Sequence, residues 1–219
     1  MREIDYDNWE RRQAYEFFSG ISHPFYAVSF RQDVTGLYNC AKQQGISFYE
    51  SMIWACTQAV NSVSAFRVAM RGGRPVELDM RHPSFTDLRP GEAQFNIITM
   101  RHNTDLSAFC EEASRLRRTQ DTFLDESKET DDLIYYSCLP WIDLTAATNE
   151  RDLSAPHALD DSIPRIIWGK YTEENGRRIL GISMEVNHRF IDGYHIGRFA
   201  QNLEKCINSL GGSENDQNN

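Results

Sequence analysis

Residues 184–195 join a strand to a helix through a sharp turn, and they read Met184-Glu185-Val186-Asn187-His188-Arg189-Phe190-Ile191-Asp192-Gly193-Tyr194-His195. Side chains alternate between the two faces of a strand. His188 therefore shares a face with four apolar residues, Leu180, Ile182, Met184 and Val186, and that face should be buried. Gly193 can adopt the backbone angles that a turn into the following helix requires. The pattern predicts a histidine at the end of a core strand, followed by a turn that contains Asp192.

Three interpretations of His188 are open at this point. A histidine on an apolar face is most often a core residue with its hydrogen bonds satisfied. Its neutral ring, with an ordinary pKa of about 6.5, can also act as a general base near pH ~7. A metal site with Asp192 and His195 is a third hypothesis, although no glutamate joins them. A separate hypothesis makes Cys138 a nucleophile with a histidine base, although residues 134–139 are typical of a core strand.

Strand and helix patterns mix along the rest of the chain. Residues 165–171 and 178–188 are apolar-rich runs joined by Glu173-Glu174-Asn175-Gly176, and Asn-Gly is a strong hairpin signal. A helix should follow Gly193 and end near Gly211. Further expected elements are helices at 9–18 (capped by Asp7 or Asn8), after a capping box at Ser47 and Glu50, and at 105–119, and strands at 26–31, 76–79, 95–100 and 134–139. Because helices and strands do not alternate strictly, we expect an α+β layer architecture.

Composition narrows the class of protein. The chain has 219 residues, of which 40% are hydrophobic and 25% charged, as in globular domains. Its net charge of -9 disfavours partners such as nucleic acid or an anionic membrane surface. No apolar run reaches the ~20 residues that cross a bilayer, and the first residues lack the apolar core of a signal peptide. We therefore expect a cytoplasmic protein.

The cysteines and the linkers bear on domain organisation. Five widely spaced cysteines without a CxxC pair favour buried free thiols over disulfides or zinc sites. The chain has no internal repeat and no Gly/Ser/Pro-rich linker. We expect a single domain over residues 1–210 and a disordered tail over residues 211–219.

The segment His188-Arg189-Phe190-Ile191-Asp192-Gly193 resembles the HxxxDG motif of the chloramphenicol acetyltransferase superfamily, which dihydrolipoyl acyltransferases and peptide condensation domains share. Other segments resemble the chloramphenicol acetyltransferase family itself. They keep the family's order and approximate spacing, and they are Asn8-Trp9-Glu10-Arg11-Arg12, Phe66-Arg67-Val68-Ala69-Met70, Ser137-Cys138-Leu139-Pro140-Trp141, Trp168-Gly169-Lys170-Tyr171 and Tyr194-His195-Ile196-Gly197-Arg198-Phe199. The resemblance covers nearly the whole chain.

The resemblance implies a fold, an assembly and an activity. The fold is a two-layer α/β sandwich, a mixed sheet with helices packed on one side. The assembly is a homotrimer with active sites at its subunit interfaces. The activity is transfer of an acetyl group from acetyl-CoA, a co-substrate, to a hydroxyl of chloramphenicol, which inactivates the antibiotic. Neither a permanently bound cofactor nor a metal is implied.

The resemblance also assigns roles to residues. His188 matches the general base, and Ser137 matches the serine whose hydroxyl stabilises the oxyanion, in direct transfer within a ternary complex. Asp192 matches a structural aspartate and Arg11 its ion-pair partner. A carboxylate at a buried turn needs a cation, and arginine offers a planar bidentate partner. Binding residues are matched more loosely: pocket aromatics at Phe17, Phe18, Tyr26, Phe95 and Phe123, and CoA-channel residues at Lys170 and Tyr171.

Four departures from the family concern the acceptor. Asn187 replaces a second histidine, and Arg189 resembles the H-R-x-x-D-G form of dihydrolipoyl acyltransferases. Ile167 replaces a threonine, and residues 142–163 form a longer segment of different pattern. Loops carry specificity while a scaffold keeps the chemistry. The alternatives are therefore an acyltransferase for another alcohol, amine or thiol, or a non-catalytic ligand-binding homologue.

Overall fold

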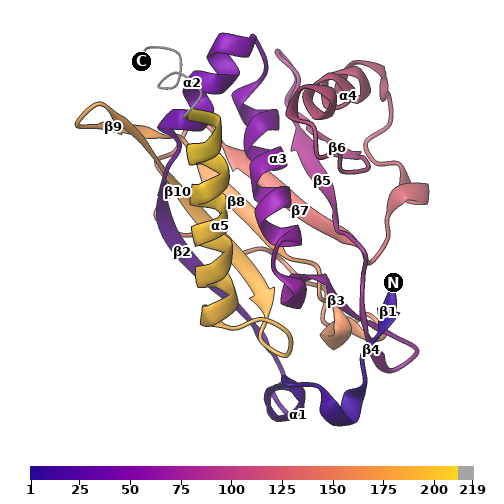
Figure 1. The fold of residues 1–219 in the computed structure, drawn as a ribbon. Coiled ribbons are helices and arrows are strands. Elements are labelled where there is room, and N and C mark those ends of the chain that lie inside the picture. Colours follow the sequence, from indigo (N-terminus) through magenta and orange to yellow (C-terminus); the bar gives the residue numbers. More distant parts are fainter. Residues whose placement is uncertain (212–219) are drawn as a thin grey trace.

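The computed structural model describes residues 1–211, and Figure 1 shows their arrangement. The α-helices are α1 (Arg12–Ser19), α2 (Thr35–Gln44), α3 (Phe48–Asn61), α4 (Leu106–Thr119) and α5 (Gly193–Gly211). The strands are β1 (Arg2–Glu3), β2 (Phe25–Asp33), β3 (Val68–Arg71), β4 (Arg74–Glu77), β5 (His82–Asp87), β6 (Asn96–Thr99), β7 (Leu133–Leu139), β8 (Arg165–Gly169), β9 (Thr172–Glu174) and β10 (Arg177–Asn187). Short 3-10 helices are η1 (Tyr6–Asn8), η2 (Ser64–Arg67), η3 (Glu126–Lys128) and η4 (Ala158–Asp160).

One large mixed sheet organises the fold. Its strand order is β2-β10-β8-β7-β5-β6, with β9 paired to β10. The β5–β7 and β7–β8 pairs are parallel, and the other pairs are antiparallel. Helices α2, α3 and α5 lie across one face of this sheet (Figure 1). The predicted α+β class, with a mixed sheet and helices on one side, is confirmed.

The two faces of β10 have different partners, as its alternating sequence predicts. Leu180, Ile182, Met184 and Val186 belong to the apolar core shared with α3 and α5. The intervening residues face the other side, where segment 142–163 covers them. The Ala147 amide donates to Ser183 Oγ at 2.9 Å, and the Asn149 amide donates to Glu185 Oε2 at 2.9 Å. Segment 142–163 is thus attached to the strand that leads to His188.

Two glycines allow segment 142–163 to approach the sheet. A Cβ at Gly169 would lie 2.6 Å from Leu144 Cβ, and a Cβ at Gly181 would overlap the Leu144 carbonyl oxygen. We predict that Gly181→Ala lowers the free energy of unfolding by about 3 kcal/mol, because backbone atoms must move to admit the methyl group. Urea titration measures this.

Gly197→Ala is the matched control for that substitution. Gly197 lies in α5, and a methyl group placed on its Cα would have no neighbouring atom within 4 Å. Alanine there should raise the free energy of unfolding by about 0.5–1 kcal/mol, since glycine weakens a helix interior. A Gly181→Ala protein as stable as the wild type would contradict the packing described here.

Several predicted elements form at or near their expected positions. Ser47 caps α3, its Oγ accepting the Glu50 amide at 3.3 Å. The other half of the predicted capping box does not form, because the Glu50 carboxylate binds Arg117 and Ser114 instead. The Asn175-Gly176 turn joins β9 to β10 with positive φ at both residues.

The N-terminal helix is shorter than predicted. It begins at Arg12 rather than at Trp9, and the chain first forms the 3-10 turn η1. The cap of that turn is Asp5, whose carboxylate accepts the Asp7 amide at 3.2 Å and the Asn8 side chain at 2.7 Å. These bonds keep residues 6–8 out of the α-helix.

The C-terminal helix extends into the segment predicted to be a tail. Gly211, the first residue of that predicted tail, is the last residue of α5. The remainder of the predicted tail, 212–219, lies outside the described residues. Within residues 1–211, no helix combines the length and apolar character needed to cross a membrane.

Candidate active site

His188 lies immediately after the last residue of β10 and is held by its backbone and by two aromatic rings. Its amide donates to the Pro24 carbonyl at 2.7 Å. The imidazole stacks on the Phe18 ring, with centroids 3.7 Å apart and an interplanar angle of 21°. The Tyr26 ring centroid is 4.3 Å from the imidazole. Tyr26 pairs with Val186 across the β2–β10 ladder, so the two residues share the predicted face.

The environment of His188 keeps its ring neutral. Burial lowers the imidazole pKa below 6.5, and the nearby Arg11 charge lowers it further, while Asp192 acts in the opposite direction. The ring is only half-buried, so it is still reachable from solvent. A neutral imidazole at a half-open position can accept a proton.

Arg11 anchors the turn that follows His188. Its guanidinium donates to three acceptors: the His188 carbonyl at 2.7 Å, the Arg189 carbonyl at 3.2 Å and Asp192 Oδ2 at 2.5 Å. Asp192 in turn accepts the Tyr194 amide at 3.0 Å, at the start of α5. Burial would raise the pKa of Asp192, but the Arg11 hydrogen bond and the nearby His195 hold it below its usual value. Arg11 thus cross-links the N-terminal segment, the His188 turn and α5.

We predict that a reaction in which His188 acts as the base has an acid limb below pH 6.5 in its pH profile. The imidazole must be neutral to act as a base, so activity should fall as pH falls through the lowered His188 pKa. The charged or titratable groups that face the ring are Arg11, Asp192 and Tyr26, and the pKa of Tyr26 is raised to about 12, so it does not titrate in this range. Measurement of kcat/KM between pH 5 and pH 8 (a range of roughly the His titration) tests this. A limb centred above pH 7 would contradict it.

Ser137 does not lie near His188 in the same chain. It sits on β7 and pairs with Ile167 of β8, which pairs with Ser183 of β10. Ser183 precedes His188 by five residues, which at ~3.4 Å per residue corresponds to roughly 17 Å along the strand. His188 therefore lies beyond one end of β10, whereas Ser137 lies level with the middle of β10 and two residues before the end of β7 on the opposite side of the sheet.

We call these two ends the lower end, where β10 ends beside α1, and the upper end, where β5, β7 and β8 end (Figure 1). The lower end brings together His188, Phe18, Tyr26, Arg11 and Asp192. Phe17 packs edge-on against Phe18 there, but 69% of it is exposed.

The remaining predicted site residues lie toward the upper end. Phe95 precedes β6, whose first residue pairs with the last residue of β5. The Phe95 and Phe123 rings contact each other, with centroids 5.6 Å apart, and both are exposed. Lys170 and Tyr171 follow β8, where they line a surface depression together with Trp141.

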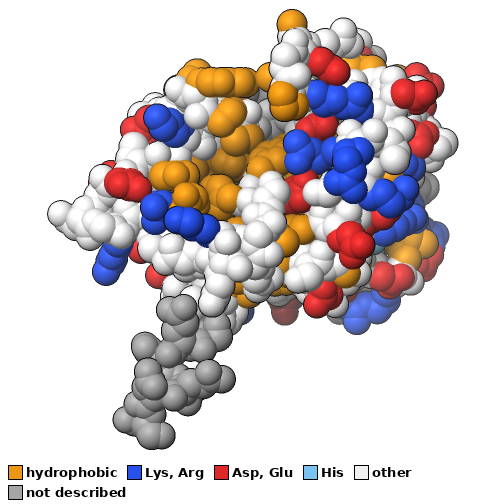
Figure 2. All heavy atoms as spheres, turned by 90° about the horizontal axis from the view of Figure 1, so that it is seen from above, with side chains coloured by type: hydrophobic (Ala, Val, Ile, Leu, Met, Phe, Trp, Pro, Cys, Tyr) orange, Lys and Arg blue, Asp and Glu red, His pale blue; other side chains and the backbone are white. Residues whose placement is uncertain are grey.

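The face at the upper end is hollowed. Figure 2 shows apolar side chains gathered in this hollow, with Lys and Arg side chains clustered on one side of it. Tyr171, which follows β8 at this end, packs against Tyr38 and Phe48, with ring centroids 5.5 and 6.1 Å away. The two ends of the sheet therefore differ in character: a histidine between aromatic rings at one, and an apolar hollow with basic neighbours at the other.

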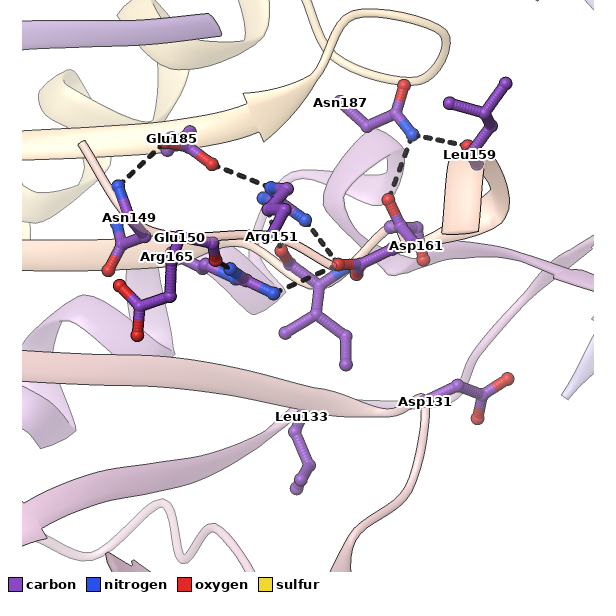
Figure 3. A network of polar contacts seen from close by, with 12 residues as sticks. Asp131, Leu133, Asn149, Glu150, Arg151, Leu159, Asp161, Arg165, Glu185 and Asn187 are labelled. Atoms are coloured by element: carbon purple, nitrogen blue, oxygen red, sulfur yellow. Dashed lines mark hydrogen bonds and ion pairs between the residues drawn. The ribbon is translucent and has the colours of Figure 1, made fainter. Parts of the chain in front are cut away.

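The sequence analysis did not predict the largely buried ionic network that joins β10 to segment 142–163 (Figure 3). Arg151 Nε donates to Glu185 Oε1 at 2.7 Å, and Arg151 also pairs with Asp161. Arg165 donates to the same Asp161 carboxylate at 3.2 Å. Glu185 could have indicated this network, because a carboxylate inside a core strand requires a cation as its partner. The sequence does not say that segment 142–163 supplies it.

The geometry disfavours the nucleophile hypothesis for Cys138. This residue lies on β7, and burial raises the pKa of its thiol to about 12. The thiol is protonated at neutral pH and is a poor nucleophile. As for the metal hypothesis, no cluster of three or more potential metal ligands occurs among residues 1–211.

Comparisons with known proteins extend these observations. A family model described as chloramphenicol acetyltransferase matches residues 1–204. Chloramphenicol acetyltransferase 3 of Escherichia coli is 27% identical over 210 residues, covering 94% of this chain and 97% of that protein. The Streptomyces acrimycini enzyme is 27% identical over 209 residues, covering 93% of each.

Solved structures agree. A chloramphenicol acetyltransferase superposes with a TM-score of 0.84 at 25% identity, covering 94% of this chain and 100% of that one. A probable dihydrolipoamide acetyltransferase from Listeria monocytogenes, with a TM-score of 0.63 at 14% identity, shares the fold alone. The fold and these matches define an acyltransferase. The chain belongs to the chloramphenicol acetyltransferase family.

Proposed function

We propose that this protein transfers an acetyl group from acetyl-CoA to a hydroxyl of chloramphenicol, with His188 as the general base. The observation that carries the proposal is the His188 site: a neutral imidazole at a strand end, flanked by aromatic rings and anchored by Arg11. Family membership supplies the reaction class. Residues 1–210 would act as one cytoplasmic acyltransferase domain, with no permanently bound cofactor.

The proposed reaction proceeds in one ternary complex. His188 takes the proton of the acceptor hydroxyl while that oxygen attacks the thioester carbonyl carbon. The Ser137 hydroxyl donates a hydrogen bond to the resulting oxyanion. Collapse of this tetrahedral intermediate breaks the carbon–sulfur bond, and the proton returns from His188 to the departing CoA thiolate. The products are the acetyl ester and free CoA.

We further propose that each active site forms between two copies of the chain. His188 and Ser137 are separated by roughly 17 Å along the strand direction in one chain, so one molecule cannot place both beside a single reacting carbonyl. A cyclic assembly can bring the lower end of one copy to the upper end of the next. We propose a homotrimer of this kind.

The upper end suits the acyl donor. CoA combines a long, largely apolar arm with phosphates, and this end offers an apolar hollow with Lys and Arg side chains beside it (Figure 2). Lys170 and Tyr171 follow β8 at this same end and line a surface depression, and we propose that they contact CoA. We assign Phe17, Phe18, Tyr26, Phe95 and Phe123 to the acceptor pocket, contributed by two neighbouring copies.

Release of free thiol from acetyl-CoA tests the proposed function. Purified protein should release CoA rapidly when chloramphenicol is added, and release should require the acceptor. Thiol release with another alcohol, amine or thiol but not with chloramphenicol would support an acyltransferase whose acceptor is not chloramphenicol. Tight drug binding without any release would instead support a non-catalytic binding protein.

The second candidate, a different acceptor, is favoured by a specific observation. Asn187 and Arg189, two departures from the family, attach turn 159–161 of segment 142–163 to the backbone on both sides of His188. A panel of acceptors that differ in size and polarity distinguishes the two candidates.

A further inference from the structure

Asn187 and Arg189, the two residues that flank His188, both form hydrogen bonds with the short turn at residues 159–161. Asn187 Nδ2 donates to the Leu159 carbonyl at 2.8 Å and to the Asp161 carbonyl at 2.9 Å (Figure 3). Arg189 Nη1 donates to the same Leu159 carbonyl and to Asp160 Oδ1 at 2.9 Å. Asn187 Oδ1 also accepts the Arg189 amide at 3.0 Å. Both flanking side chains are buried, so these hydrogen bonds belong to the interior of the protein rather than to its surface.

Arg189 also reaches the helix that carries the aromatic wall of the site. Its Nε donates to Ser19 Oγ at 2.9 Å, and its Nη2 donates to the Tyr15 hydroxyl. Its guanidinium carbon lies 4.5 Å from the Tyr15 ring centroid. Tyr15 and Ser19 belong to α1, the helix whose Phe18 stacks on His188. One side chain thus connects α1, turn 159–161 and the backbone beside His188.

We propose that Arg189 is a positioning residue that fixes α1 and turn 159–161 relative to His188, and so sets the shape of the acceptor side of the site. This inference rests on the proposed function. A guanidinium has five N–H donors in a fixed plane, and here they point to both elements at once. A lysine cannot reproduce that geometry, because its ammonium is a point charge on a flexible stem. The upper end, with Lys170 and Tyr171, is not touched by these contacts.

Steady-state kinetics of three variants test the proposal. Arg189→Met should raise the KM for chloramphenicol about tenfold or more, since small displacements of a wall that orients a substrate are costly. The KM for acetyl-CoA should change by less than about twofold, because Arg189 has no hydrogen bond or ion pair with Lys170 or Tyr171, the residues proposed to contact CoA. Arg189→Lys should have a KM for chloramphenicol nearly as high as that of Arg189→Met.

Arg151→Met is the matched control. Arg151 is as deeply buried as Arg189 and joins the same segment to β10 through Glu185 and Asp161, but it has no hydrogen bond or ion pair with α1. It should lower the melting temperature without the selective rise in the KM for chloramphenicol. Equal changes in both KM values for Arg189→Met, or full recovery by Arg189→Lys, would overturn the proposal.

Hydrogen exchange separates this proposal from the proposed function. If the wild type does not acetylate chloramphenicol, the acceptor assignment fails, and the amides of residues 12–19 still report on Arg189. Their exchange should be faster in Arg189→Met than in the wild type or in Arg151→Met. Unchanged exchange of α1 would overturn the positioning role by itself.

Discussion

Replacing His188 by alanine is expected to lower kcat for acetyl transfer to chloramphenicol by about 10²–10⁴-fold, the usual contribution of a positioned general base. The protein should still fold, because the backbone bonds of His188 to Pro24 and to Arg11 do not involve the imidazole. Acetyl-CoA binding should be nearly unchanged, since the contacts with CoA are proposed for Lys170 and Tyr171 and not for the His188 side chain. Initial rates of thiol release measure kcat, and an equilibrium binding assay with CoA measures its affinity.

His157→Asn is the matched control for His188→Ala. His157 is an exposed histidine at the start of η4 with a φ of 60°, a conformation that asparagine tolerates. It should retain wild-type kcat. A His188→Ala enzyme within about tenfold of wild-type kcat would remove His188 from the role of base, because such a loss lies below the range for general-base catalysis.

Replacing Ser137 by alanine is expected to cause the second large loss of kcat. Loss of one donor to an oxyanion typically costs about 10²–10³-fold in kcat. Ser137 is half-buried on β7, and alanine fits that position without filling new space. The loss should therefore appear in kcat, with little change in the KM for either substrate, because in the proposed mechanism the hydroxyl acts on charge that develops only in the transition state.

Ser137→Thr tests whether the hydroxyl is what matters. Threonine keeps an oxygen donor and suits a strand, so it should retain more activity than alanine. Full activity in Ser137→Ala would mean that another group stabilises the oxyanion.

The sequence predicted those parts of the fold in which apolar period and local signals agree. Strand β10 and helix α5 follow from alternation up to Val186 and helical spacing after Gly193. Helix α2 was missed, although Gly45, with a φ of 68°, and the Asp33 carboxylate bonded to the Thr35 amide mark its two ends. Strand β5 was missed because Pro83 argues against a strand and Phe85 is its only other apolar residue.

Sequence reasoning reached the candidate site only where a motif carried it. The Arg11 contact with Asp192 is one that charge and burial make plausible, but the residues are 181 positions apart and only the fold brings them together. Only one feature of the sequence pointed to the hydrogen bonds that Asn187 and Arg189 form with turn 159–161. That feature is the departure from the family on both sides of His188. All but one of the partners of Asn187 and Arg189 in segment 142–163 are main-chain carbonyls, the exception being Asp160 Oδ1. Every residue has a main-chain carbonyl, so the sequence does not indicate which one is the acceptor.

The most direct test of a site shared between copies is complementation between two inactive variants. His188→Ala and Ser137→Ala would be co-expressed with different tags, and native mass spectrometry would establish that mixed oligomers form. Random cyclic assembly of equal amounts leaves both residues intact at about one quarter of the interfaces. We predict that the mixture recovers about that fraction of wild-type activity. Mixed oligomers no more active than either variant alone would contradict a catalytic centre built from His188 of one chain and Ser137 of another.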